Sequence, residues 1–144
     1  EIAKTLTAKD IYGPILPHDC RWKMLRKVTI YPNYAEGEMM VEGIHCQGVF
    51  KKNFLMPVGL GLEMASHVLG VMAAEAKGFP AGAVPFLGGI NKAIFSTDRP
   101  RAGEILRAEV RIVRQGNSWV IGAYETYVGT RLVDKVSSLL GAFG

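Results

Sequence analysis

The longest apolar stretch of the chain lies in its middle, over residues 57 to about 76, and it predicts a helix that is surrounded by protein. The stretch consists mainly of Leu, Met, Ala and Val and offers no hydrophilic face before Glu75 and Lys77. It opens with a proline, which suits the first turn of a helix because no N–H is needed there. A membrane span needs about 20 predominantly apolar residues, whereas this stretch carries Glu63 and His67 within it. We therefore predict a core helix.

The segments around that helix have the patterns of strands. In the clearest one, Leu106, Ala108 and Val110 alternate with charged residues, which is typical of a strand with one buried face. Gly-Asn at 116–117 and Gly-Thr at 129–130 predict tight hairpin turns. The predicted elements are a short helix over 8–17, a strand over 22–31, a turn over 32–37, a strand over 38–44, a loop over 45–55, the long helix, and strands over 84–95, 104–114, 118–128 and 131–143. This arrangement is of the α+β class, with one central helix and a largely antiparallel sheet.

Composition adds limits to this picture. The 144 residues are 49% hydrophobic and 21% charged, so they fit one globular domain over 1–144. The net charge of +4 permits an acidic partner, but the basic residues alternate with core positions and no aromatic stacking motif accompanies them, so nucleic acid is not expected. Cys20 and Cys46 lack the spacing of a metal site or a disulfide scaffold, and a cytoplasmic location is the simplest expectation.

Glu63 is the main candidate for chemistry. A carboxylate in an apolar helix is costly unless it is hydrogen-bonded, and desolvation raises its pKa toward values that suit proton transfer. His67 lies one helical turn further on, so both side chains can share a face. At this point the alternative stays open that Glu63 lies in an exposed first turn, favoured by the helix dipole, and that His67 is an ordinary core histidine.

Four segments together resemble the β-hydroxyacyl-acyl-carrier-protein dehydratases of the FabZ and FabA type. These segments are Ile15–His18, Pro57–Glu63, Phe86–Phe95 and Arg99–Glu104. The resemblance runs from about Leu16 to the C-terminus, and it implies a hot-dog fold, in which an antiparallel sheet wraps a long central helix. It also implies a homodimer or higher even oligomer with active sites at the subunit interface, and a role in fatty-acid synthesis. No metal or redox cofactor is implied.

The chain departs from that family where the catalytic base is expected. Val49 occupies the histidine position, Phe50 matches the next residue, and Lys51 and Lys52 replace a proline and a glycine. Dehydration needs a base and an acid, so the loss of one positioned group removes about 10²- to 10⁴-fold of rate. Two other histidines are candidates to compensate. His67 is the better one, and a loop rearrangement would be needed to bring in the other, His45.

Three functions follow from these residues. The first is dehydration of a 3-hydroxyacyl thioester of acyl-carrier protein or coenzyme A, with Glu63 as acid or base; the second is an acyl-thioesterase that uses Glu63; the third is a non-catalytic acyl-binding or partner subunit. The resemblance places the acyl chain against Val49, Phe50, Met56, Val58, Gly59, Leu60, Met64 and Phe95. It also suggests a positive rim for an acidic carrier protein, made of Lys51, Lys52, Arg99 and Arg101.

Overall fold

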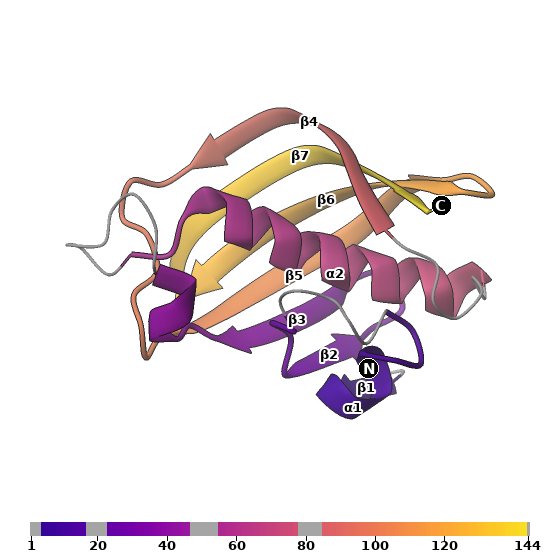
Figure 1. Ribbon diagram of the computed structural model, residues 1–144. Coiled ribbons are helices and arrows are strands. Elements are labelled where there is room, and N and C mark those ends of the chain that lie inside the picture. Colours follow the sequence, from indigo (N-terminus) through magenta and orange to yellow (C-terminus); the bar gives the residue numbers. More distant parts are fainter. Residues whose placement is uncertain (1–3, 17–22, 47–54, 78–84, 144) are drawn as a thin grey trace.

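A single long helix lies across one face of a curved, seven-stranded antiparallel sheet (Figure 1). The computed structural model describes residues 4–16, 23–46, 55–77 and 85–143. Its elements are β1 (Lys4–Thr7), α1 (Ala8–Ile11), β2 (Lys27–Ile30), β3 (Ala35–Met40), the 3₁₀ helix η1 (Gly43–Cys46), α2 (Val58–Lys77), β4 (Pro85–Phe95), β5 (Ile105–Gln115), β6 (Trp119–Val128) and β7 (Arg131–Phe143). The strand order is β1-β2-β3-β5-β6-β7-β4, so β4 lies at one edge of the sheet. The α+β class and the wrapped central helix are confirmed.

The core forms between α2 and the concave face of the sheet. The helix packs on β5 and on β3, β4, β6 and β7. Met64, Ala65, Val68 and Val71 are completely buried, which explains why the helix sequence shows so little amphipathic pattern. Among the described residues, no helix is long and apolar enough to cross a membrane.

Glycine on β3 lets the helix approach the sheet closely. A Cβ atom at Gly37 would lie 2.2 Å from the Val68 Cγ2 atom and 3.1 Å from the Leu25 Cδ2 atom. We expect Gly37→Ala to lower the free energy of unfolding by about 1–3 kcal/mol, the usual cost of overpacking a core. Urea denaturation measures this change. Gly43→Ala is the control, because no atom of the described residues lies within 4 Å of a Cβ there. Equal stability of the two variants would contradict the close approach.

The N-terminal part differs most from the sequence prediction. The helix expected over 8–17 ends at Ile11, because Gly13 takes a φ of 108° and a proline follows it. The strand expected over 22–31 begins only at Lys27, and the expected turn over 32–37 is shorter, since β3 already begins at Ala35. The strand β1 was not predicted: it is four residues long, and only Leu6 in it is buried.

Candidate active site

The start of α2 is held by short backbone contacts. Just before the helix, Leu55 forms an antiparallel bridge with Arg101, and the Met56 N–H donates to the Pro100 carbonyl at 2.7 Å. The segment that follows β4 therefore lies alongside the residues that lead into α2. This pairing fixes the position at which the helix begins.

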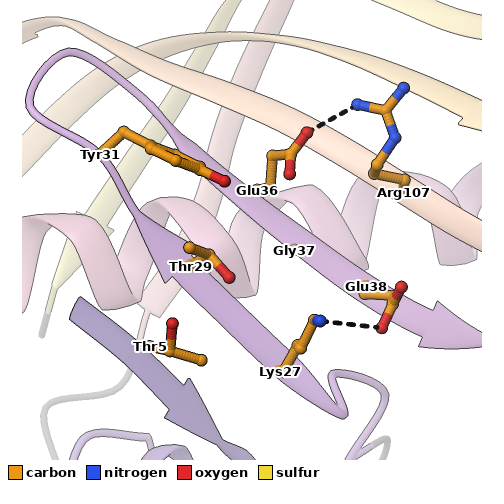
Figure 2. A pocket seen from close by; sticks show the side chains of 8 residues that line it. All are labelled: Thr5, Lys27, Thr29, Tyr31, Glu36, Gly37, Glu38 and Arg107. Atoms are coloured by element: carbon orange, nitrogen blue, oxygen red, sulfur yellow. Dashed lines mark hydrogen bonds and ion pairs between the residues drawn. The ribbon is translucent and has the colours of Figure 1, made fainter. Parts of the chain in front are cut away.

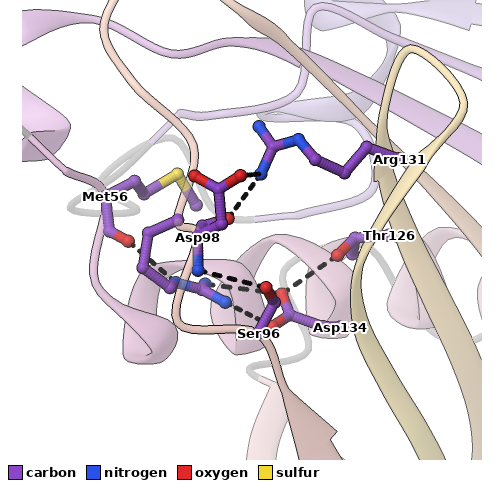
Figure 3. A network of polar contacts seen from close by, with 7 residues as sticks. Met56, Ser96, Asp98, Thr126, Arg131 and Asp134 are labelled. Carbon is purple, nitrogen blue, oxygen red and sulfur yellow. Dashed lines mark hydrogen bonds and ion pairs between the residues drawn. The ribbon is translucent and has the colours of Figure 1, made fainter.

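A buried ion pair reinforces that junction (Figure 3). The Arg99 guanidinium donates from Nη1 to the Asp134 Oδ1 atom at 2.5 Å and from Nε to the Met56 carbonyl at 3.2 Å. The Thr126 hydroxyl donates to the Asp134 Oδ2 atom at 3.0 Å. Arg99 is 8% exposed and Asp134 1%. We call Arg99 and Asp134 the anchor pair.

Helix α2 rests directly on the anchor pair at Gly61. A Cβ atom there would lie 3.1 Å from the Asp134 Oδ2 atom and 3.6 Å from the Arg99 Nη2 atom. A larger residue would push the helix away from the ion pair. The small residue at this position is therefore explained by the close approach of the helix to two charged side chains.

Glu63 is half-buried and is the sixth residue of α2. The first turn of the helix contains no acidic residue, so the interpretation that placed Glu63 in an exposed first turn is wrong. At about 100° per residue, Glu63 lies about 200° around the helix from Gly61. Its side chain therefore leaves the helix on a side different from the one that rests on the anchor pair.

His67 is buried and hydrogen-bonded to the N-terminal segment. The Tyr12 hydroxyl lies 3.0 Å from His67 Nδ1 and accepts a hydrogen bond from the Leu25 N–H at 3.0 Å. The hydroxyl has one proton and two lone pairs, so beside the Leu25 N–H it either donates to Nδ1 or accepts from it, according to the tautomer of the neutral ring. Burial lowers the pKa of His67 to about 4. His67 is therefore neutral near pH 7 and a poor base through Nδ1.

The pKa of His67 has a consequence for stability. Its folded pKa of about 4 lies below the ordinary value of 6.5, so between these values the unfolded chain binds a proton that the folded chain does not. Stability should fall as the pH drops from 6.5 towards 4, by up to about 3 kcal/mol. Urea denaturation of the wild type and of His67→Gln across this window measures the difference. If both show the same pH dependence, the buried neutral state of His67 is wrong.

The residues predicted to hold an acyl chain differ in how deeply they are buried. Met56 and Met64 are completely buried, and Leu60 and Phe95 are partly buried and pack on the core. Val58 is half-buried and Gly59 is exposed, and within the described part of the chain no atom lies within 4 Å of a Cβ placed at Gly59. The first turn of α2 thus has an open side as well as a packed one. Val49 and Phe50 lie outside the described residues.

The predicted positive rim is wrong in one member. Arg99 is buried in the anchor pair and is not available to a carrier protein. Arg101 is exposed, with an Asp98 carboxylate 3.9 Å away. Lys51 and Lys52 lie outside the described residues. Asp134 was not among the residues predicted for the site, although a carboxylate in a strand between the apolar residues Val133 and Val136 is a signal for it.

The other candidate histidine has a structural contact. His45 lies in η1, where its Nδ1 atom accepts the Glu42 N–H at 2.9 Å. Burial lowers its pKa as well. Cys46 is buried beside it; Cys20 and His18 lie outside the described residues. In the part of the chain that the structure describes, no three His, Cys, Asp or Glu side chains gather as a metal site requires.

A concavity lies on the outer face of the sheet, away from α2 (Figure 2). We call it the outer groove; it is lined by Thr5, Lys27, Thr29, Tyr31, Glu36, Gly37, Glu38 and Arg107. Its charges neutralise one another: Arg107 pairs with Glu36 at 2.8 Å, and Lys27 lies 4.0 Å from Glu38. The groove is polar and internally paired, so it is a poor match for an acyl chain.

Comparison with known proteins identifies the fold. No family model matches the chain, and no curated protein matches its sequence. Among solved structures it is similar to the dehydratase heterocomplex ApeI:P from Xenorhabdus doucetiae, with a TM-score of 0.73 and 17% identity over 96% of this chain and 91% of that one. It is also similar to the PaaI protein of the E. coli phenylacetic acid degradation operon (TM-score 0.59, 15% identity, 78% of each chain) and to mouse thioesterase superfamily member 2 (TM-score 0.58, 15% identity, 88% of this chain and 86% of that one). The chain has the hot-dog fold.

Proposed function

We propose that this protein acts on acyl thioesters and that Glu63 transfers the proton. The observation that carries the proposal is the half-buried carboxylate of Glu63, which lies one turn beyond a helix start that is both anchored and open on one side. Backbone N–H groups of a first helical turn have no partner within the helix and can polarise a thioester carbonyl. The fold neighbours, which include a dehydratase heterocomplex and thioesterases, agree with this class of substrate.

Dehydration of a 3-hydroxyacyl thioester is the first candidate, and the similarity to the dehydratase heterocomplex ApeI:P, with a TM-score of 0.73 over 96% of this chain, supports it. The Glu63 carboxylate removes the proton from the carbon next to the thioester carbonyl, and the first-turn amides stabilise the charge on the carbonyl oxygen. The resulting carboxylic acid then gives this proton to the departing hydroxyl, which leaves as water. The products are an enoyl thioester and the original carboxylate. His67, whose Nδ1 atom lies 3.0 Å from the Tyr12 hydroxyl, transfers no proton in this scheme.

Hydrolysis is the second candidate, and the state of His67 favours it. A buried histidine that is hydrogen-bonded to Tyr12 and has a pKa of about 4 is a weak base and a poor replacement for the family's catalytic base. In hydrolysis Glu63 alone takes a proton from water while the hydroxide attacks the carbonyl, and the thiolate leaves with that proton. A partner subunit without turnover is the third candidate. Its apolar lining would still bind an acyl chain, with a transfer free energy of about 0.8 kcal/mol for each methylene that is buried.

One comparison separates these functions. Purified protein is incubated with 3-hydroxyacyl, enoyl and saturated acyl thioesters of acyl-carrier protein and of coenzyme A. Loss of water, hydration and release of free thiol are followed in parallel. Dehydration predicts the first two without thiol release, hydrolysis predicts thiol release, and a binding subunit predicts neither. If none of these thioesters binds saturably to the protein, the proposed substrate class is wrong.

We also expect the protein to form a homodimer. The edge strand β4 is 11 residues long, and Ile90 and Ile94 on it are 40% and 68% exposed. A long apolar sheet edge invites pairing with a second chain. Light scattering at micromolar concentration should give about twice the 15.7 kDa mass of one chain.

The dimer has a matched pair of variants. Ile94→Lys should shift the protein towards monomer, whereas Val113→Lys, at a side chain that is 55% exposed on β5, should not. A monomeric wild type would contradict the expected assembly. If the wild-type chain is monomeric alone but forms a dimer with a related, catalytically active chain, the partner-subunit candidate gains support.

A further inference from the structure

The anchor pair is buried and links three separate segments of the chain. Arg99 comes from the segment that follows β4, Asp134 from β7, and both lie against Gly61 in α2. Burying two opposite charges costs desolvation energy, and apolar residues of similar volume are often just as stabilising in their place. The presence of the pair at this point is therefore not explained by stability alone.

The contacts of the anchor pair are directed at the beginning of α2. Arg99 donates from Nε to the carbonyl of Met56, two residues before the helix begins, and uses its Nη atoms on Asp134. Asp134 also accepts from Thr126 on β6, so its carboxylate is oriented from two sides. A planar guanidinium with several donors in fixed directions holds such an arrangement better than a single ammonium group does.

Close to the anchor pair, the hydroxyl of Tyr124 is a buried polar group without a hydrogen bond among the described residues. Tyr124 is 1% exposed, and its hydroxyl has no hydrogen-bond partner in the described structure. Burial and the Asp134 carboxylate raise the pKa of this phenol, so it stays neutral. The hydrogen bonds of the anchor pair go to the Met56 carbonyl, to the Thr126 hydroxyl and between its two members, and among the described residues none goes to Tyr124.

We propose that the anchor pair is a positioning device for the site at the start of α2. It holds the first turn, and with it the backbone amides and Glu63, at a fixed place against the sheet. This inference rests on the proposed function for its kinetic consequence only. A misplacement of about 1 Å at a reacting site can lower the rate about 10²-fold, so a device of this kind would act on kcat more than on stability.

The test replaces the pair by apolar residues of similar size. The double variant Arg99→Met with Asp134→Leu removes both charges together and leaves no unpaired buried ion, so it should fold. We expect kcat to fall about 10- to 100-fold on the thioester that the wild type turns over, with a smaller change in KM. Arg99→Lys keeps the charge but not the fork of donors, and it should recover only part of kcat.

Hydrogen exchange provides a readout that needs no activity. In the double variant, the amides of residues 61–64, which donate to the carbonyls of the first turn, should exchange about tenfold faster or more, while those of residues 69–73 keep their rates. The control is Glu125→Gln with Lys135→Met, a partly exposed pair that joins β6 and β7 at 3.7 Å, one residue along each strand from Thr126 and Asp134. It should change neither kcat nor exchange.

Two results would overturn the inference. One is a double variant with wild-type kcat and unchanged exchange at residues 61–64; the other is a loss of kcat without faster exchange there. If the wild type turns over no thioester, the proposed function fails, and exchange alone then decides whether the pair positions the helix start. If Arg99→Lys matches the wild type in both readouts, charge balance suffices and the positioning role is wrong.

Discussion

Glu63→Gln is expected to lower thioester turnover by about 10²- to 10⁴-fold, the usual contribution of a positioned acid or base. The amide keeps the volume of the side chain and can still hydrogen-bond, so the fold and acyl binding should be retained. The affinity for a saturated acyl thioester should change by less than tenfold, or about 1.4 kcal/mol. Steady-state kinetics and equilibrium binding on the same preparation measure both quantities.

The same helix offers a matched control for this variant. Glu75 lies near the other end of α2, is exposed, and pairs with Lys4 at 3.1 Å. Glu75→Gln should leave turnover unchanged. If Glu63→Gln keeps full activity, Glu63 does not transfer the proton. If instead both variants lose activity equally, the loss reflects the helix as a whole.

Asp134→Asn is expected to destabilise the protein by about 3–5 kcal/mol, because it leaves the buried Arg99 cation without its counter-charge. The Asp134 carboxylate accepts hydrogen bonds from the Arg99 Nη1 atom and from the Thr126 hydroxyl, and among the described residues no other acceptor is bonded to these two donor atoms. Urea or guanidinium denaturation gives the change in free energy of unfolding. This stability effect is large because only one partner is removed.

A surface carboxylate supplies the comparison. Glu125→Gln removes a partly exposed partner of Lys135 one residue along β6 from Thr126, and exposed pairs contribute about 0–1 kcal/mol. The two variants should therefore differ by at least about 2 kcal/mol. Similar stabilities would mean that Arg99 finds water or another acceptor when Asp134 is replaced.

The sequence predicted the long helix and the four C-terminal strands well because their patterns are strong. The run after Pro57 is apolar over five turns, and hairpins at Gly116 and Gly129 delimit β5, β6 and β7. The N-terminal elements were less predictable. β1 is short and mostly polar, and its place in the sheet is set by pairing with β2, which no local pattern reveals.

The site was predicted only where local pattern was enough. Glu63 stood out as a carboxylate in an apolar helix, but the partner of His67 is Tyr12, 55 residues away in sequence. Arg99 was assigned to an exposed rim because a basic residue in a polar segment is usually solvated. Its burial depends on Asp134, which the hairpin of β6 and β7 brings opposite Thr126. Such pairings are set by tertiary contacts.

The most direct test of the proposed site is to map where an acyl thioester binds. A saturated acyl chain that carries a diazirine, joined by a thioester to pantetheine, is photolysed with the wild-type protein, and labelled peptides are identified by mass spectrometry. We predict labels within residues 49–64 and at Phe95, and unlabelled acyl pantetheine should compete for them. Labels confined to the outer groove, or labels without competition, would contradict an acyl-thioester site at the start of α2.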